Sequence, residues 1–411
     1  MFLKLRQPID EMEYPTPRIL EGGRSYEYPF TFVVPDRLLP QVCTHPKKNA
    51  HIQRSHIMLP PTLGDPILSS NGKTLLDDMA PSMSQIGYTI RASVLQKQLV
   101  GPGVVAIAGI AKKVRIIPTV EEEPPVEISA SPSLCTRKEK SVKRGTLRGK
   151  LGHIVASSSQ PKPIQLLPPD GEPTDTVSTV ATVNLRFDPV GDEQPPPLGT
   201  MTSKLRVNTF FSAAPWDDFP STTGMPFAHI GCGLYTESVP LSTMCVASAK
   251  WTKQSTAADT MRRDSTDSSS SDSSTGPSSA FTGDTYYTAS VVVPVTLPKS
   301  KAFVPTFHSC LMSRIYALDL SLTYHTPATN LMTPTISLRL PIQFTSQAKR
   351  AESIKSQLGV TVTQQELEEF FHPRNVTSPT DFSNTRNDVV INDDLAPPEY
   401  TERLSALRAN R

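Results

Sequence analysis

The fold class of this chain is decided by the stretch Ile315-Tyr316-Ala317-Leu318-Asp319-Leu320-Ser321-Leu322-Thr323-Tyr324. Large apolar or aromatic side chains alternate along it with small or polar ones, which is the period-two pattern of a strand with one buried face. The stretch from Thr335 to Phe344 repeats the alternation, and we expect the two strands to pair. Pro341 removes a hydrogen-bond donor from the second strand, which predicts an edge position or a bulge.

Strand-like stretches also occur in the rest of the chain, and their spacing predicts β-sandwiches. No alternation of strands and helices appears, and 40 proline residues in 411 favour short strands and turns over helices. We expect further strands at Tyr28 to Val34, Ser55 to Leu59, Ile86 to Leu95, Lys113 to Ile117, Val177 to Phe187, Leu205 to Ser212 and Tyr286 to Val295.

Three stretches interrupt this pattern by composition. The stretch from Thr119 to Gly171 is rich in proline and charge and poor in large apolar residues, so we expect a disordered linker or insert there. The stretch from Thr252 to Gly283 is rich in serine, and we expect a mobile loop. After Phe344 the strand pattern stops, and a capping box at Thr363 to Glu366 predicts one short helix in a largely disordered tail, 347–411. The two predicted β lobes are therefore residues 1–118 and 172–346.

Charge and cysteine content exclude several classes of protein. The formal charge of +2 from 41 basic and 39 acidic residues gives no reason to expect nucleic acid as a partner. The five cysteines are scattered and form no CxxC pair, so we expect reduced thiols in a cytoplasmic protein. The longest apolar run, Val100 to Ala111, is too short to span a bilayer, so any membrane contact is expected to be peripheral.

Several segments in order resemble fungal arrestin-like proteins, the α-arrestin family of trafficking adaptors. The segments similar to that family's N-lobe are Tyr28 to Pro35, Leu59 to Gly64 and Asp77 to Pro81, and those similar to its C-lobe are Phe303 to Cys310 and Arg314 to Tyr324. The resemblance implies an all-β chain with two arrestin-like β-sandwich lobes. The family's N-lobe has several strands before the segment that begins here at Tyr26, so we expect an incomplete first lobe.

A PPxY sequence, Pro397-Pro398-Glu399-Tyr400, lies in the predicted tail. Two prolines pre-form a polyproline II turn that fits the groove of a WW domain, and the tyrosine fills a second pocket. Thr401 to Leu404 could continue as a helical turn, which would place Leu404 beside the WW surface. A chance match is the alternative interpretation of so short a motif.

The resemblance and the PPxY sequence together imply an adaptor. Such a protein recruits a WW-domain HECT-type ubiquitin ligase to the cytosolic tails of membrane transporters or receptors, at the plasma membrane or endosomes, and promotes their ubiquitylation and endocytosis. The alternative is an arrestin-fold signalling or sorting scaffold that uses no ligase. The PPxY sequence distinguishes the two.

A basic cluster and several serines are further candidates for function. The cluster could contact lipid headgroups or acidic partner tails, although a solvated run of charge is an equally good interpretation. Its members are Arg137, Lys138, Lys140, Lys143, Arg144, Arg148 and Lys150. Candidate phosphorylation sites are Ser265 behind Arg262-Arg263, Ser269 ahead of Asp272, and Ser141 and Thr146 within the cluster.

No motif of an enzyme is present. The chain lacks a GxSxG elbow, a P-loop, an HExxH pair and a GxGxxG turn. Cys43, His45, His51 and His56 could bind zinc in principle, but their spacing matches no tight finger, and Pro46 with Lys47 and Lys48 suits a surface turn. We therefore expect no catalysis, no cofactor and no metal.

Overall fold

The computed structural model describes residues 2–7, 9, 11–69, 72–98, 103–123, 134–144, 149–167, 177–221, 231–256, 275–327 and 333–347. These residues are mostly β, with several antiparallel sheets and one short α-helix, as the alternating patterns predict. The described residues divide into two units, one within 1–86 and 116–349 and the other within 87–115. In the described part of the chain, no helix has the length and hydropathy needed to cross a membrane.

The first unit contains a five-stranded antiparallel sheet built around the stretch that decides the fold. β14 pairs with β9 on one side and with both β13 and β15 on the other, and β9 pairs with β10. The predicted pairing of the two alternating stretches is confirmed, with Leu318 opposite Leu340, and Pro341 lies on an edge strand. The bounds are β9 (Leu198–Ser212), β10 (Cys232–Cys245), β13 (Phe307–His308), β14 (Met312–Tyr324) and β15 (Thr335–Ile342).

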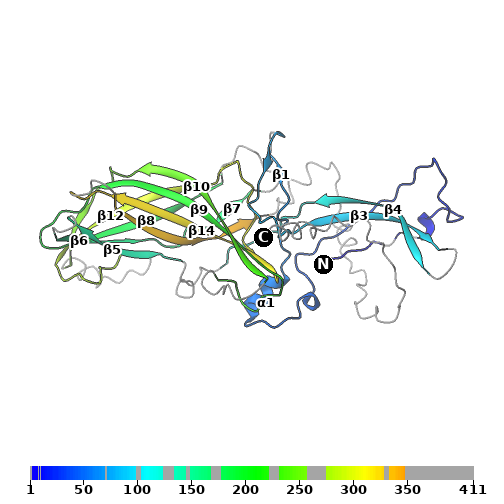
Figure 1. Ribbon diagram of the computed structural model, residues 1–411, viewed down its shortest axis with the longest axis horizontal. Helices are drawn as coiled ribbons and strands as arrows, with labels where there is room; N and C mark the ends of the chain where they lie inside the picture. Colours follow the sequence, from blue (N-terminus) through cyan, green and yellow to red (C-terminus); the bar gives the residue numbers. More distant parts are fainter. Residues whose placement is uncertain are drawn as a thin grey trace, which may run out of the picture. The chain divides into compact units, whose positions relative to one another are not determined.

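A second five-stranded antiparallel sheet has the order β11-β12-β8-β6-β5. The long strands β8 and β12 pair over ten residues, with Val183 opposite Val291. The bounds are β5 (Arg137–Lys143), β6 (Lys150–Ser157), β8 (Ser178–Pro189), β11 (Thr252–Ser255) and β12 (Thr285–Thr296). The strands of both sheets run alongside one another in Figure 1.

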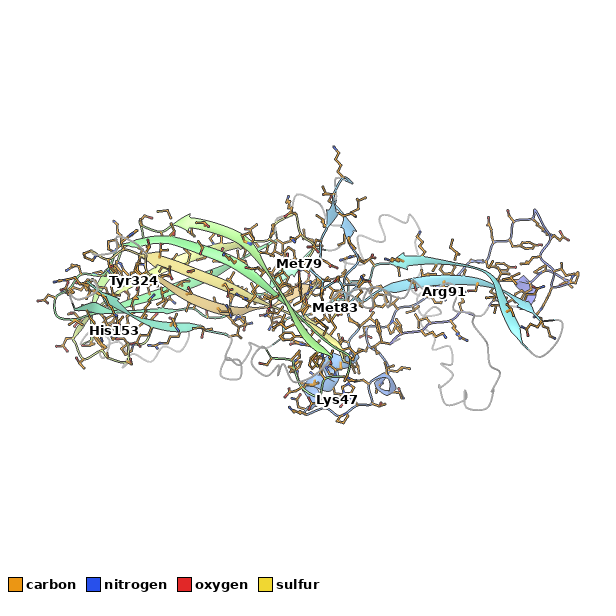
Figure 2. All side chains as sticks on the ribbon, in the orientation of Figure 1. Lys47, Met79, Met83, Arg91, His153 and Tyr324 are labelled. Atoms are coloured by element: carbon orange, nitrogen blue, oxygen red, sulfur yellow. The ribbon has the colours of Figure 1, made fainter. Side chains whose placement is uncertain are left out.

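The apolar faces of these two sheets enclose one core. Leu205 and Leu318 of the first sheet belong to the same buried cluster as Leu185 and Val293 of the second. Tyr324, labelled in Figure 2, is 1% exposed and belongs to this core. The alternation of buried and exposed residues along each strand therefore produces a β-sandwich, because each sheet can bury only one face against the other.

Shorter elements complete the first unit. β7 (Ile164–Leu166) and β16 (Phe344–Ser346) form a parallel pair, and β1 (Ile67–Leu68) and β2 (Leu75–Leu76) form an antiparallel pair. Two short 3-10 helices are η1 (Glu11–Glu13) and η2 (Pro40–Val42). The α-helix is α1 (Ala50–Ile57), capped by the Asn49 side chain, whose Oδ1 accepts a hydrogen bond from the Ile52 amide.

The predicted first sandwich lobe is not formed by the described residues of 1–118. Tyr28 to Val34 is not a strand, and Ser55 to Leu59 begins inside α1. The helix was missed because its buried face consists of Ile52, Ser55 and His56, so it has little apolar periodicity. The short strands β1 and β2 add one small ribbon.

In the second unit, the described residues form an antiparallel ribbon. β3 (Tyr88–Lys97) pairs with β4 (Val104–Val114), so the strand predicted from Ile86 to Leu95 is confirmed in most of its length. Most side chains of both strands are exposed, including Ile107 at 58% and Ile110 at 74%.

The expected disordered linker from Thr119 to Gly171 is wrong for much of its length, because β5, β6 and β7 lie within it. β5 is the edge strand of its sheet and buries Val142, while its lysines stay exposed. Lysine on an edge strand discourages pairing with another chain, and it also gives the strand the composition of a linker. The sandwich therefore begins before residue 172.

The expected mobile loop from Thr252 to Gly283 is corrected in part. Thr252–Ser255 is strand β11, paired with β12. The serine-rich centre of this stretch, and the tail with its predicted helix, lie outside the described residues.

The carboxylate of Glu139, in strand β5, makes the stability of the fold depend on pH. Glu139 of β5 accepts hydrogen bonds from the amide and hydroxyl of Ser279, each at 2.9 Å, and its Oε1 lies 3.2 Å from His153 Nδ1. The pKa of Glu139 lies below its ordinary value of 4.5, mainly because of the hydrogen bond from the Ser279 amide. The Ser279 hydroxyl and His153 lower it further. A carboxylate with a depressed pKa stabilises the fold above its unfolded pKa, and this stabilisation is lost as the pH falls through the folded pKa.

We expect Glu139→Gln to lower the free energy of unfolding by about 1 kcal/mol at neutral pH, because a charged acceptor becomes a neutral one. The difference from wild type should shrink as the pH falls from 4.5 through the lower pKa of the folded wild-type carboxylate. Urea unfolding measured across this pH range tests the prediction, with the exposed Glu27→Gln as control. A difference that is constant with pH would contradict it.

Candidate functional site

A shallow basic hollow lies over the polar face of the first sheet. It has a volume of about 780 Å³ and is lined on one side by the edge strand β5 of the second sheet. Its charged lining consists of five basic side chains and one carboxylate, namely Lys138, Lys140, Lys204, Arg206, Arg339 and Asp319. The hollow therefore carries a clear excess of positive charge.

Asp319 holds the arginines of this hollow in place. Arg206 donates to Asp319 Oδ2 from Nε and Nη2, at 3.0 and 2.8 Å, and Arg339 Nε donates to Asp319 Oδ1 at 2.6 Å. Lys204 lies directly opposite Asp319 across the β9–β14 pair. Lys140 Nζ donates to the carbonyl of Thr335 on β15 at 2.8 Å, which connects β5 to β15 at one side of the hollow. An acidic peptide or a phosphate group would meet several fixed donors here.

The structure divides the predicted basic cluster. Lys138 and Lys140 line the hollow, whereas Arg137 donates from Nη2 to the carbonyl of Pro277 at 2.7 Å. Arg144 pairs with Glu193. Lys143 and Lys150 are exposed, and Arg148 lies outside the described residues. Sequence reasoning missed Lys204, Arg206 and Arg339 because β9 supplies only the first two and β15 the third, and only the pairing of β9, β14 and β15 brings them together.

Most of the other predicted site residues lie outside the described part of the chain. These are the phosphorylation candidates Thr146, Ser265 and Ser269 and the WW-binding residues Pro397, Pro398, Tyr400 and Leu404. Ser141 is described: it lies in β5 opposite His153 and is half-buried. Its half-buried position in a paired strand limits access by a kinase.

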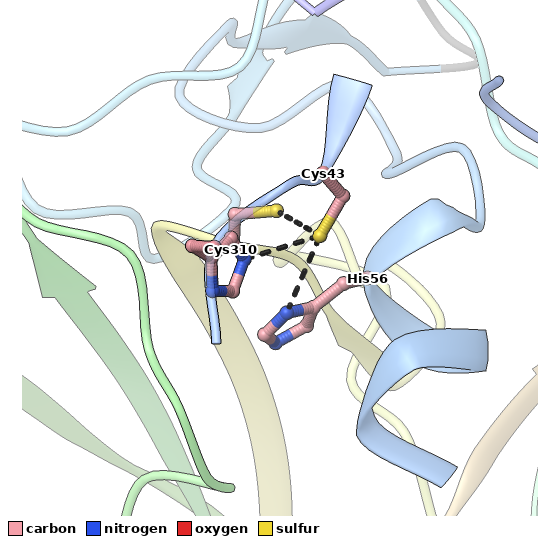
Figure 3. A group of neighbouring side chains, drawn as sticks. Cys43, His56 and Cys310 are labelled. Atoms are coloured by element: carbon pink, nitrogen blue, oxygen red, sulfur yellow. Dashed lines mark hydrogen bonds between the residues drawn. The ribbon is translucent and has the colours of Figure 1, made fainter. Parts of the chain in front are cut away.

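A cluster of cysteine and histidine side chains forms a second site, at one end of the sandwich. Cys43 directly follows η2, His45 lies in the next turn, and His56 lies in the last turn of α1. Cys310 comes from the turn between β13 and β14, where the amide of Ser309 donates to the carbonyl of Met312. Figure 3 shows Cys43, His56 and Cys310 pointing toward one another.

The donor atoms of these four residues all lie within 4.8 Å of one another. Cys43 Sγ is 3.3 Å from Cys310 Sγ, 3.1 Å from His45 Nε2 and 4.0 Å from His56 Nδ1. Cys43 is 4% exposed and His56 is 2% exposed, while His45 and Cys310 are half-buried.

Burial changes the protonation of this cluster. It lowers the pKa of His56 to about 4, so that the ring is neutral near pH 7. Burial, together with the neighbouring Cys43, raises the pKa of Cys310 to about 12. His308, close in sequence to Cys310, also has a pKa lowered by burial, to about 3.

The sequence interpretation grouped Cys43 and His45 with both His51 and His56, and it expected no metal. His51 is not part of the cluster: its ring packs against Phe219, with centroids 5.2 Å apart. The fourth member, Cys310, lies 267 residues from Cys43, so no local spacing could have identified it.

Comparison with known proteins gives no family for this chain. No model of a protein family matches the sequence, and no curated protein matches it significantly.

Proposed function

We propose that the chain is an arrestin-like adaptor that recruits a WW-domain HECT-type ubiquitin ligase to membrane transporters or receptors. The observation that carries the proposal is Pro397-Pro398-Glu399-Tyr400, which follows β16, the last strand among the described residues, in the sequence. A WW domain binds such a motif when it is separate from the folded core. The adaptor acts in the cytoplasm and is recruited peripherally to the plasma membrane or endosomes.

The β-sandwich supports the arrestin-like part of the proposal. The segments that resemble the family's C-lobe, Phe303 to Cys310 and Arg314 to Tyr324, contribute β13 and β14 of the first sheet. The segments that resemble the N-lobe lie in the part of the chain where the described residues form ribbons and α1. The arrestin-like part of the proposal therefore rests on the C-lobe segments.

The basic hollow supports a role in binding cargo. Its excess of positive charge suits an acidic stretch in the cytosolic tail of a transporter or receptor, and arginine side chains held by Asp319 lose little entropy on binding. The ligase motif and the cargo surface then act together, because a weak WW contact becomes effective when the ligase and its substrate are held on one molecule. Nothing in this role requires catalysis by the chain itself.

Deleting residues 396–411 should abolish ubiquitylation of the cargo and leave the sandwich folded, because the deletion removes the motif and no strand of either sheet. Immunoblotting of cargo from cells that express the full or the truncated chain tests this, with circular dichroism as the check on folding. A second truncation, of residues 402–411, keeps the motif and should retain most of the ubiquitylation. Unchanged ubiquitylation after loss of the motif would favour the alternative, a sorting scaffold that uses no ligase.

A further inference from the structure

The Cys–His cluster has the composition of a closed metal site. Two thiol sulfurs and two imidazole nitrogens converge from two distant parts of the chain, and the ligand atoms lie within 4.8 Å of one another. A structural zinc ion takes four such ligands in a tetrahedron, and Cys₂His₂ is one of its usual sets. We propose that Cys43, His45, His56 and Cys310 bind one Zn²⁺ ion.

The distances fit a tetrahedral site. Zn–S bonds of about 2.3 Å and Zn–N bonds of about 2.0 Å place two sulfurs about 3.8 Å apart and a sulfur and a nitrogen about 3.5 Å apart. The observed distances from Cys43 Sγ are 3.3 Å to the other sulfur and 3.1 and 4.0 Å to the two nitrogens. Each of these three distances is within about 0.5 Å of its tetrahedral value.

The surroundings orient the ligands. His45 Nδ1 lies 3.0 Å from the carbonyl oxygen of Pro46. A carbonyl only accepts, so Nδ1 carries the proton, and the lone pair is on Nε2, the atom that faces Cys43. Lys47 Nζ donates to the carbonyl of Cys43 at 2.5 Å, which holds the turn between the first two ligands. Hydrogen bonds of this kind commonly position zinc-binding histidines and the backbone beside them.

The position of the cluster assigns zinc a structural role. Residues 36–59 bury only a few apolar side chains, Leu38, Cys43, Ile52 and Leu59, in the described structure. Zinc would connect this segment, which includes α1, to the β13–β14 turn. Four protein ligands leave no position open for water or substrate, and two thiolates neutralise the charge of the ion. Thiolate and imidazole ligands exclude magnesium and calcium as the preferred ions, since those favour oxygen.

Metal analysis of the purified, reduced full chain tests the proposal. We expect about one zinc ion per chain in the wild type, as for a closed four-ligand site. Cys310→Ser and His56→Ala should bind zinc at least about 100-fold more weakly in competition with a chelator, because loss of a second-shell partner alone costs 10–100-fold. The matched controls are Cys245→Ser, an exposed cysteine, and His51→Ala, a histidine on the same helix outside the cluster. Both controls should keep the ion.

A second measurement needs no variant. Cobalt added to the metal-free wild-type chain should give the absorption of a tetrahedral site with sulfur-to-cobalt charge transfer. An octahedral spectrum, a reconstituted wild type without zinc, or equal zinc in Cys310→Ser and wild type would overturn the proposal. A disulfide between Cys43 and Cys310 in freshly purified protein, detected by thiol titration and mass spectrometry, would also overturn it.

Discussion

Replacing Arg314 with alanine is expected to destabilise the sandwich by about 3 to 5 kcal/mol, because it leaves buried oxygen atoms without their donor. Arg314 is fully buried in β14. Its Nη1 donates to the carbonyl of Asp78 at 2.5 Å and its Nη2 to that of Met79 at 2.7 Å. Nε and Nη2 also donate to Thr209 Oγ1 on β9, at 3.0 and 2.7 Å. One side chain thus joins β14 and β9 of the first sheet to the segment that contains Asp78 and Met79.

The hydrogen bonds from Arg314 hold the backbone of Asp78 and Met79 in place. Met79, labelled in Figure 2, is 1% exposed, belongs to the main core and has a positive φ of 58°. Such a backbone conformation is unfavourable for a side chain like methionine and needs support from its neighbours. Without the Arg314 guanidinium, the Met79 carbonyl would lose its hydrogen bond and its backbone would lose that support. The missing side chain would also leave a cavity.

Urea unfolding followed by tryptophan fluorescence measures the effect, since Trp251 packs against the core. Arg314→Lys should give a smaller loss, because an ammonium group keeps the charge but not the planar fork of donors. The control is Arg24→Ala, whose ion pair with Glu21 is more than half exposed and should contribute less than about 1 kcal/mol. A loss below about 1 kcal/mol in Arg314→Ala would show that water can replace the guanidinium.

Tyr400→Ala and Pro398→Ala should each remove most of the binding of the full chain to a WW domain. We expect micromolar affinity for the wild type, about −8 kcal/mol. The tyrosine pocket and the proline groove act together, so the loss of either anchor leaves too little contact for stable binding. Leu404→Ala should weaken binding by a smaller amount, because it would touch the WW surface through one further helical turn.

Isothermal titration of a WW domain from the ligase into each full-length variant measures these effects. Glu399→Ala is the matched control within the motif, since its position faces away from the groove, and it should bind as the wild type does. Equal affinity of Tyr400→Ala and wild type would mean that the motif is a chance match. The scaffold function would then replace the adaptor function.

Local sequence patterns predicted two paired strands of the first sheet well. β14 and β15 were identified, with their pairing, because alternate residues of each strand face one core and must be apolar. The edge strand β5 was missed because Val142 is its only buried residue, and its lysines made it look like a linker. Helix α1 was missed for a related reason: its buried face includes Ser55 and His56.

The sequence by itself determined the mostly β composition, the strand pair β14–β15 and the presence of a PPxY motif, because each depends on residues close together in the chain. Only the tertiary structure decided which residues form the basic hollow, the buried contacts of Arg314 and the Cys–His cluster. Arg206 lies 113 residues from Asp319 in the sequence and Cys310 lies 267 residues from Cys43, and only strand register and packing bring these side chains together. Such long-range contacts leave no periodic signal, since each contributing segment supplies only one or two of the residues.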